Sequence, residues 1–146
     1  MLNDVLSALS AVATLQNFLI MTAGIWGGVI VGAIPGMTGT MAVTLALPFT
    51  FYMAPVPSIL LLVALYKGST YGGSVSAILI KTPGTASAAC TTLDGYPLAR
   101  QGKAGKALNM ALYSSCMGDF ISNISLIFIA APLALLALRI GPPEYF

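Results

Sequence analysis

Charged residues are scarce in this sequence. Of 146 residues, 7% are charged and 58% are hydrophobic, and the mean hydropathy is +0.93. Soluble domains carry about 25% charged residues, because a folded chain needs a polar surface to face water. Six Lys or Arg and four Asp or Glu cannot supply such a surface for 15.0 kDa. The surface must therefore be solvated by lipid or covered by other protein, which predicts an integral membrane protein.

Histidine is absent and cysteine is rare. The first absence excludes His-based proton relays, catalytic triads and His metal sites within this chain. Cys90 and Cys116 lack metal or redox spacing and are interpreted as small buried residues in helices. Gly102-Lys103 is followed by Ala104 and lacks the upstream Gly of a phosphate loop. We therefore expect no enzyme, no cofactor, no metal site and no ATP-driven pumping by this chain.

The sequence instead has apolar stretches interrupted by Gly and Pro. About 20 apolar residues span a bilayer. The expected elements are an interfacial helix at 1–13, a span at 15–34, a half-helix at 38–50, an interrupted span at 58–80, a cytoplasmic basic loop at 94–106, and one or more spans at 107–138. The pattern predicts an all-α, polytopic transmembrane protein with Pro-Gly-interrupted half-helix or re-entrant segments. The number of full crossings and the side of the N-terminus stay open.

Two further patterns refine these expectations. The third stretch is expected to break in its middle, at Lys67–Gly73, where Gly and small polar residues gather. The loop at 94–106 holds three of the six basic residues, which the positive-inside rule places in the cytoplasm. The first basic residue is Lys67, so no cleavable signal peptide is expected.

Small residues recur every four positions in two of the apolar stretches. A strip of this kind lies on one face of a helix and lets a second helix approach closely. The first strip consists of Gly24, Gly28, Gly32 and Gly36, and the second of Gly68, Gly72 and Ser76. We expect close helix packing at both strips.

Two segments share an arrangement of apolar helix, Pro-Gly break and Thr-bearing helix start. They are Ile34-Pro35-Gly36-Met37-Thr38 and Thr82-Pro83-Gly84-Thr85. Unpaired backbone amides at such a break persist in a membrane only where they are buried in protein or line a wet cavity. The N-terminus of a half-helix offers free N–H groups and a positive dipole end, which suits a carboxylate. The alternative is that each Pro-Gly is an ordinary interfacial turn.

Three ionisable residues are expected within the membrane: Lys67, Lys81 and Asp119. Burying such a charge costs about 2.5–3.5 kcal/mol or more unless it is paired or snorkels. Asp119 has at least ten uncharged residues on either side. It is interpreted as an ion-coupling or proton site, or as a charge partner of Lys67 or Lys81. The alternatives are a water-exposed kink at Gly118-Asp119 and snorkelling of the two lysines.

Five ordered blocks of sequence together resemble one protein family. The blocks are Gly32-Ala33-Ile34-Pro35-Gly36-Met37-Thr38, Tyr71-Gly72-Gly73-Ser74-Val75-Ser76-Ala77-Ile78-Leu79, Thr82-Pro83-Gly84-Thr85, Leu93-Asp94-Gly95-Tyr96-Pro97-Leu98-Ala99 and Gly141-Pro142-Pro143-Glu144-Tyr145-Phe146. They resemble the large membrane subunit of the tripartite tricarboxylate transporters, the TctA family, in family order and over essentially the whole chain.

The resemblance implies a multi-pass permease subunit of the bacterial inner membrane. Its implied partners are a small membrane subunit and a periplasmic solute-binding protein. It would take up citrate or other carboxylates by symport with Na⁺ or H⁺. The positions carried over to substrate binding are Pro35, Gly36, Thr38, Tyr71, Gly72, Gly73, Ser74, Thr82, Pro83, Gly84 and Thr85.

The sequence departs from the family pattern at two ionisable residues and in its length. Many relatives have Asn or another uncharged residue where this chain has Lys81, and many have Gly where it has Asp119. Family members are several times longer, so the chain resembles their N-terminal part. The alternative to a permease fragment is a truncated, non-transporting membrane protein with a structural role or none.

Overall fold

Residues 10–137 are described by the computed structural model, and every regular element among them is helical. The elements are α2 (Leu15–Ala33), α3 (Gly39–Thr50), α4 (Pro55–Ile80), the 3-10 helix η1 (Ala86–Ala89), α5 (Thr91–Leu98), the π-helical turn η2 (Ala99–Lys103) and α6 (Ala104–Ala137). The helical fold class is confirmed. The chain divides after Ala111 into two compact units. The interfacial helix expected at 1–13 lies mainly outside the described residues.

Helix α2 occupies the stretch expected as the first span. Thr14 is its N-cap, and its side chain accepts a hydrogen bond from the Asn17 backbone N–H at 3.3 Å. The buried Asn17 side chain donates to the Ala11 carbonyl at 2.7 Å, which fixes the chain entering the helix. The helix ends before Pro35, where Ile34 turns to extended geometry, because a following proline disfavours helical backbone.

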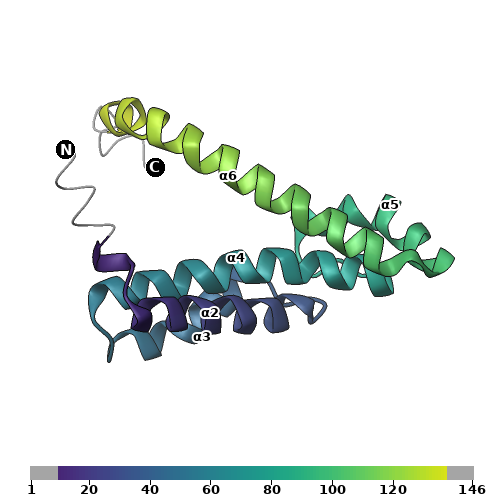
Figure 1. Cartoon of the computed structure of the whole chain (residues 1–146), viewed down its shortest axis with the longest axis horizontal. Coiled ribbons are helices and arrows are strands. Elements are labelled where there is room, and N and C mark those ends of the chain that lie inside the picture. The colour runs from purple at the N-terminus through teal and green to yellow at the C-terminus, as the bar shows by residue number, and fades with distance from the viewer. Residues whose placement is uncertain (1–9, 138–146) are drawn as a thin grey trace, which may run out of the picture. The chain divides into compact units, whose positions relative to one another are not determined.

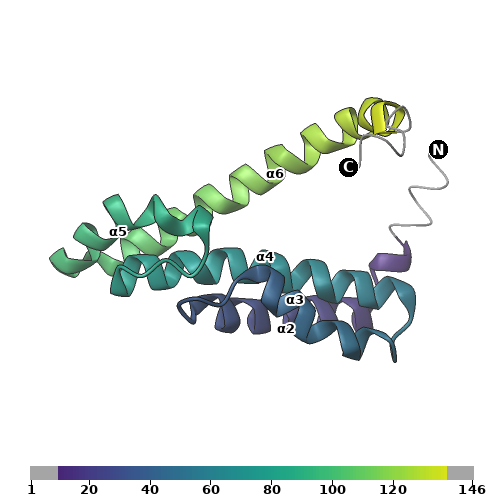
Figure 2. The same cartoon turned by 180° about the vertical axis from the view of Figure 1, so that it is seen from behind.

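Helices α2 and α4 pack closely along most of the length of α2, as both views show (Figure 1 and Figure 2). A Cβ added to Gly28 would overlap the Leu65 carbonyl oxygen and lie 2.9 Å from the Ser69 nitrogen. From the facing helix, Gly68 and Gly72 approach the α2 backbone just as closely. Only glycine permits this backbone contact.

The predicted close packing is therefore confirmed for both strips. The glycines of α2 that are buried against α4 are Gly24, Gly28 and Gly32. Gly36 does not belong to this strip, because it lies beyond the last residue of α2 and has positive φ.

Helix α4 is continuous over 26 residues, from Pro55 to Ile80. This corrects the expectation of an interrupted span at 58–80 with a break at Lys67–Gly73. The glycines there are packing residues, and the hydroxyls are satisfied within the helix. Ser69 and Thr70 donate to the Tyr66 carbonyl at 2.7 and 3.1 Å. The helix also starts three residues earlier than expected, because Pro55 occupies its first turn, where no intrahelical N–H partner is lost.

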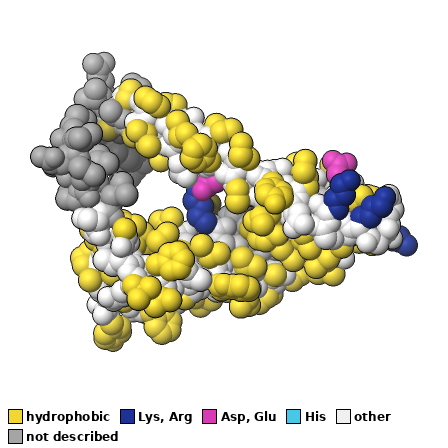
Figure 3. Space-filling model, viewed as in Figure 1, with side chains coloured by type: hydrophobic (Ala, Val, Ile, Leu, Met, Phe, Trp, Pro, Cys, Tyr) yellow, Lys and Arg dark blue, Asp and Glu magenta, His cyan; other side chains and the backbone are white. Residues whose placement is uncertain are grey.

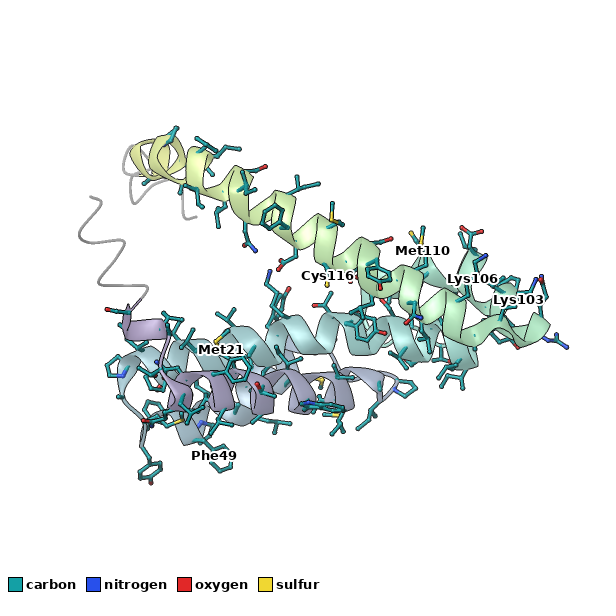
Figure 4. All side chains as sticks on the ribbon, in the orientation of Figure 1. Met21, Phe49, Lys103, Lys106, Met110 and Cys116 are labelled. Carbon is teal, nitrogen blue, oxygen red and sulfur yellow. The ribbon has the colours of Figure 1, made fainter. Side chains whose placement is uncertain are left out.

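The segment expected as a basic loop at 94–106 is helical, which corrects that expectation of its conformation. It comprises the end of α5, the turn η2 and the start of α6. One residue, Gly102, leaves helical geometry with φ 78° and forms a kink. The Ala, Leu, Arg, Gln and Lys residues of the segment 94–106 are good helix formers. The segment therefore stays helical apart from the kink at Gly102, whose positive φ glycine allows. Lys103 and Lys106 lie where α6 begins (Figure 4).

The second unit, described over residues 112–137, is the remainder of α6. The helix runs unbroken through the stretch expected as one or more spans, with Pro132 inside it. Within this unit, the Asn123 side-chain amide donates to the Asp119 carboxylate at 3.3 Å, one turn away. The Ser125 hydroxyl donates to the Ile121 carbonyl at 2.9 Å.

The outward surfaces of the helices are apolar. Large hydrophobic side chains such as Trp26 on α2 (67% exposed) and Phe49 on α3 (69% exposed) point away from the packed faces. Hydrophobic side chains cover much of the view in Figure 3, and charged ones are few. Two helical stretches of the described chain, Leu15–Ala33 and Thr91–Ala130, are long and apolar enough to cross a membrane. The exterior is thus suited to lipid.

Candidate functional site

The first Pro-Gly segment joins α2 to α3 through an exposed turn. Gly36 has φ +88°, and a Cβ there would meet no atom within 4 Å. The glycine is therefore required by backbone conformation and not by space. Thr38 follows in extended geometry as the N-cap of α3, and its hydroxyl oxygen accepts from the Met41 N–H at 3.4 Å. This short segment is the whole connection between the end of α2 at Ala33 and the start of α3 at Gly39.

An open hollow of about 570 Å³ lies against this turn and the first two turns of α3. Its lining combines hydroxyls with apolar side chains and contains no charged residue. The lining residues are Gly36, Met37, Thr38, Thr40, Met41, Thr44 and Leu45. The start of a 12-residue helix faces a solvent-accessible space here. The first N–H groups of that helix and its positive dipole end are features that favour an anion.

The second Pro-Gly segment folds back onto α4. The Gly84 N–H donates to the Gly73 carbonyl, with 3.4 Å between nitrogen and oxygen. A Cβ on Gly84 would overlap the Gly32 carbonyl oxygen and lie 3.0 Å from the Gly73 Cα. Thr85 is the N-cap of η1, and its hydroxyl lies 3.1 Å from that of Ser87. Gly84 is therefore required by space, because backbone surrounds it.

The two Pro-Gly segments converge on one stretch of α4. On the first side, a Cβ on Gly39 would lie 2.5 Å from the Ser69 hydroxyl oxygen. On the second, a Cβ on Gly73 would lie 2.7 Å from the Thr85 hydroxyl oxygen. Ser69 and Gly73 are one helical turn apart. Gly32, at the end of α2, contacts both Ser69 and Gly84. Three elements distant in sequence thus meet around a single turn of α4.

The predicted site residues fall into two groups. Four are exposed at the surface of the two segments: Pro35, Gly36, Thr38 and Thr82, with Pro83 and Thr85 partly exposed beside them. Four are buried in the helix packing behind that surface: Gly72, Gly73, Ser74 and Gly84. Tyr71 is partly exposed, and its hydroxyl donates to the Leu108 carbonyl at 3.5 Å. The buried group supports the two segments by packing and exposes little surface.

Sequence reasoning missed two residues that position the segments, Ser69 and Gly39, and one of the two contacts of Gly32. Ser69 is fully buried, and its hydroxyl donates within α4 while Gly39 packs against it. Gly32 was predicted as a helix-packing residue, without its second contact to Gly84. The sequence offered two signals for these contacts: the spacing from Gly32 to Gly39, and the position of Ser69 beside Gly68. Neither was sufficient, because local spacing does not reveal contacts between segments that are distant in sequence.

Lys81 is the one ionisable residue that adjoins a Pro-Gly segment. It is the C-cap of α4 and has φ 59° and ψ 19°, the left-handed region. That backbone costs a non-glycine residue about 1–2 kcal/mol. Its ammonium lies 5.6 Å from the centroid of the Tyr96 ring on α5, a cation–π contact worth about 0.5–1 kcal/mol at an exposed position.

The other two predicted charges lie elsewhere. Lys67 is on an exposed position of α4, two residues before the Ser69 turn. Asp119 belongs to the second unit and contacts Asn123. Among residues 10–137, no group of three or more His, Cys, Asp or Glu could hold a metal ion.

Comparisons with known proteins place this geometry in context. A family model described as the tripartite tricarboxylate transporter TctA family matches residues 18–146. A relative in Agrobacterium vitis, described as an uncharacterized 52.8 kDa protein in the TAR-I ttuC' 3' region, is 42% identical over 130 residues. The alignment covers 89% of this chain and 26% of the relative, so the chain spans about a quarter of that protein's length. The chain matches no solved structure.

Proposed function

Because this chain belongs to the tripartite tricarboxylate transporter TctA family, we propose that it forms part of the permease of a carboxylate uptake system. Uptake is driven by an ion gradient and depends on a solute-binding protein. The observation that carries the proposal is the convergence of the two Pro-Gly segments on the Ser69–Gly73 turn of α4. Transporters commonly build substrate sites from interrupted helices whose N-termini point at anionic groups.

The substrate carboxylate is proposed to bind at the start of α3. Gly36 and Thr38 line the open hollow there. The N–H groups of the first turn of α3 donate to the carboxylate, and the helix dipole favours its charge. Thr82 and Thr85 of the second segment supply further hydroxyls, which would exchange their bonds to the Ile80 carbonyl and the Ser87 hydroxyl for the substrate. Gly72, Gly73 and Gly84 act indirectly, since their lack of side chains lets the two segments pack against α2 and α4.

The remaining parts of the system are also proposals. The coupling ion is Na⁺ or H⁺, and unwound carbonyls beside the Pro-Gly breaks are suited to a cation. The protein would lie in the bacterial inner membrane with several passes. Its proposed partners are a small membrane subunit and a periplasmic solute-binding protein. The chain covers a quarter of the Agrobacterium vitis relative, so transport is assigned to the carrier that contains this segment.

The test is uptake of radiolabelled citrate or succinate by cells that express this carrier with its partner subunits. Gly36→Val and Gly84→Val should each abolish uptake, because a β-branched residue fits neither the positive φ at position 36 nor the space at position 84. Membrane insertion, measured by quantitative blotting of the membrane fraction, should stay at the wild-type level. Unchanged uptake in both variants would overturn the site, and absence of wild-type carboxylate uptake would overturn the function.

A further inference from the structure

Basic residues gather at one end of the first unit, where α4 stops and where α5, η2 and the start of α6 form a bend. Between positions 81 and 106 the sequence holds four basic residues and one acidic residue. The basic ones are Lys81, Arg100, Lys103 and Lys106, and all four are exposed. The Lys81 ammonium lies 5.6 Å from the centroid of the Tyr96 ring on α5, beside the bend. We call these four residues the basic end.

The bend that carries the basic end is anchored to α4. On α5, the buried Gly95 packs against Ile78, because a Cβ added to Gly95 would lie 2.7 Å from the Ile78 Cγ1 atom. On α6, Ala107 is buried, and the carbonyl of the next residue, Leu108, accepts from the Tyr71 hydroxyl at 3.5 Å. An anchored bend presents its side chains to a ligand at a lower cost in conformational entropy than a loose loop does.

The kink at Gly102 divides the basic side chains between two helical segments. Gly102 has φ 78°, and Arg100 precedes it in η2. Lys103 and Lys106 follow the kink and are three residues apart, a spacing that places them on one face of the start of α6. Figure 4 shows these two lysines side by side, and dark blue Lys and Arg side chains gather at the same end in Figure 3. The bend therefore concentrates positive charge at its tip.

The two ends of α4 differ in charge. Its 26 residues extend about 39 Å at 1.5 Å per residue, close to the thickness of a bilayer with its headgroups, about 40–45 Å. Phe51 and Tyr52, 81% and 94% exposed, precede its start, and no charged residue occurs from position 5 to position 66. Exposed aromatic rings suit one membrane interface. The basic end suits the other, because lipid phosphates lie there.

We propose that the basic end is a binding surface for the headgroups of anionic phospholipids. Arg100 can bind a phosphate through two parallel N–H bonds, and each lysine offers three donors to the same layer. Attraction of a basic residue to an anionic lipid surface corresponds to about fivefold in affinity. The lining of the hollow at the start of α3 includes none of the four residues. The proposal therefore goes beyond the carboxylate site and does not depend on it.

The test titrates the purified carrier that contains this segment, in detergent, with phosphatidylglycerol and with phosphatidylcholine of the same acyl chains. Native mass spectrometry gives the dissociation constant of each lipid. The triple variant Arg100→Gln, Lys103→Gln, Lys106→Gln should bind phosphatidylglycerol at least tenfold more weakly than the wild type does, and phosphatidylcholine within about twofold of it. Glutamine is a good helix former, so the circular dichroism spectrum should stay unchanged.

Two variants are matched controls. Arg100→Lys, Lys103→Arg, Lys106→Arg preserves every charge and should bind phosphatidylglycerol within about threefold of the wild type. Lys67→Gln removes one exposed charge from the middle of α4 and should stay within about twofold, whereas Lys103→Gln should weaken binding about fivefold. A raised salt concentration should reduce the wild-type preference for phosphatidylglycerol, because salt screens exposed charges.

Three results would overturn the proposal. In the first, the triple glutamine variant binds phosphatidylglycerol as tightly as the wild type does. In the second, Lys67→Gln weakens binding as much as Lys103→Gln, which would show an effect of net charge and not of this bend. In the third, inorganic phosphate at millimolar concentration displaces the lipid, which would assign the basic end to a free anion. All three would leave the carboxylate uptake proposed above untouched, because that uptake is measured separately.

Discussion

The two Pro-Gly segments have similar sequences but use glycine for opposite reasons. Gly36 is surrounded by open space and has φ +88°. Gly84 has no positive φ but is enclosed by Gly32, Gly73 and Ser76. The first glycine is a conformational requirement and the second is a packing requirement. A shared motif therefore does not imply a shared local structure.

The two segments also differ in their surroundings, since the first is exposed and the second is packed against two helices. The first segment presents its turn and the start of α3 to an open hollow. The second is anchored to α4 by the Gly84–Gly73 hydrogen bond and packs beneath the end of α2. In the proposed site, the first segment would contact the substrate, and the packed second segment would hold it in position. Substitutions at Gly36 and Gly84 can separate a requirement for space from a requirement for positive φ.

The largest effect is expected from Gly84→Ala. The added methyl would overlap the Gly32 carbonyl oxygen and crowd the Gly73 backbone, and backbone atoms cannot move aside as a side chain can. Overpacking of this kind costs about 1–3 kcal/mol. We expect a loss of that size in the unfolding free energy of the chain in detergent micelles, followed by circular dichroism.

A matched control for Gly84→Ala is Gly27→Ala on α2. Its Cβ would meet only the Leu65 Cδ2 atom, at 3.4 Å, an ordinary contact. Gly27 lies in a helix, so alanine should be neutral or slightly stabilising there. Equal destabilisation by both alanines would show that the close packing around Gly84 is not what makes it sensitive.

A smaller loss of unfolding free energy is expected at Gly36, and there the loss should depend on whether alanine or asparagine replaces glycine. Alanine there costs about 1–2 kcal/mol because of the positive φ. Asparagine tolerates left-handed geometry, so Gly36→Asn should recover much of that loss. At Gly84, asparagine should be no better than alanine, because it is larger. The same micelle unfolding measurement on all four variants tests this. A pattern in which asparagine rescues position 84 but not 36 would reverse the assignment of the two glycines.

Much of this fold was predictable from local patterns. Residues such as Thr14 and Pro35 mark where α2 starts and stops, and the Gly24–Gly32 spacing indicated its packed face. The error at Lys67–Gly73 has a clear cause. Glycines in an isolated helix weaken it, but here Gly68 and Gly72 allow α2 to approach, and the packing supports a continuous α4. Packing against α2 therefore keeps α4 continuous where helix propensity alone would predict a break.

The candidate site was less predictable than the fold. The motif residues themselves were identified, but the sequence did not separate those at the surface, such as Thr38, from those buried behind it, such as Gly73. Nor did it reveal that Lys81 adopts positive φ or that its ammonium lies over Tyr96. Both depend on contacts between segments joined by a turn, where side-chain periodicity carries no information.

The smallest effect in this comparison is expected at the two threonines. The Thr38 hydroxyl accepts from the Met41 N–H and so caps α3, whereas Thr85 makes no side-chain capping bond and contacts Ser87. Thr38→Ala should therefore cost about 0.5–1 kcal/mol of unfolding free energy, and Thr38→Ser should restore it. Thr85→Ala should cost less, because only an exposed hydroxyl pair is lost. If the alanine at position 85 proved the more damaging, α3 would not depend on its cap, and the start of α3 would be a weaker place for a substrate carboxylate.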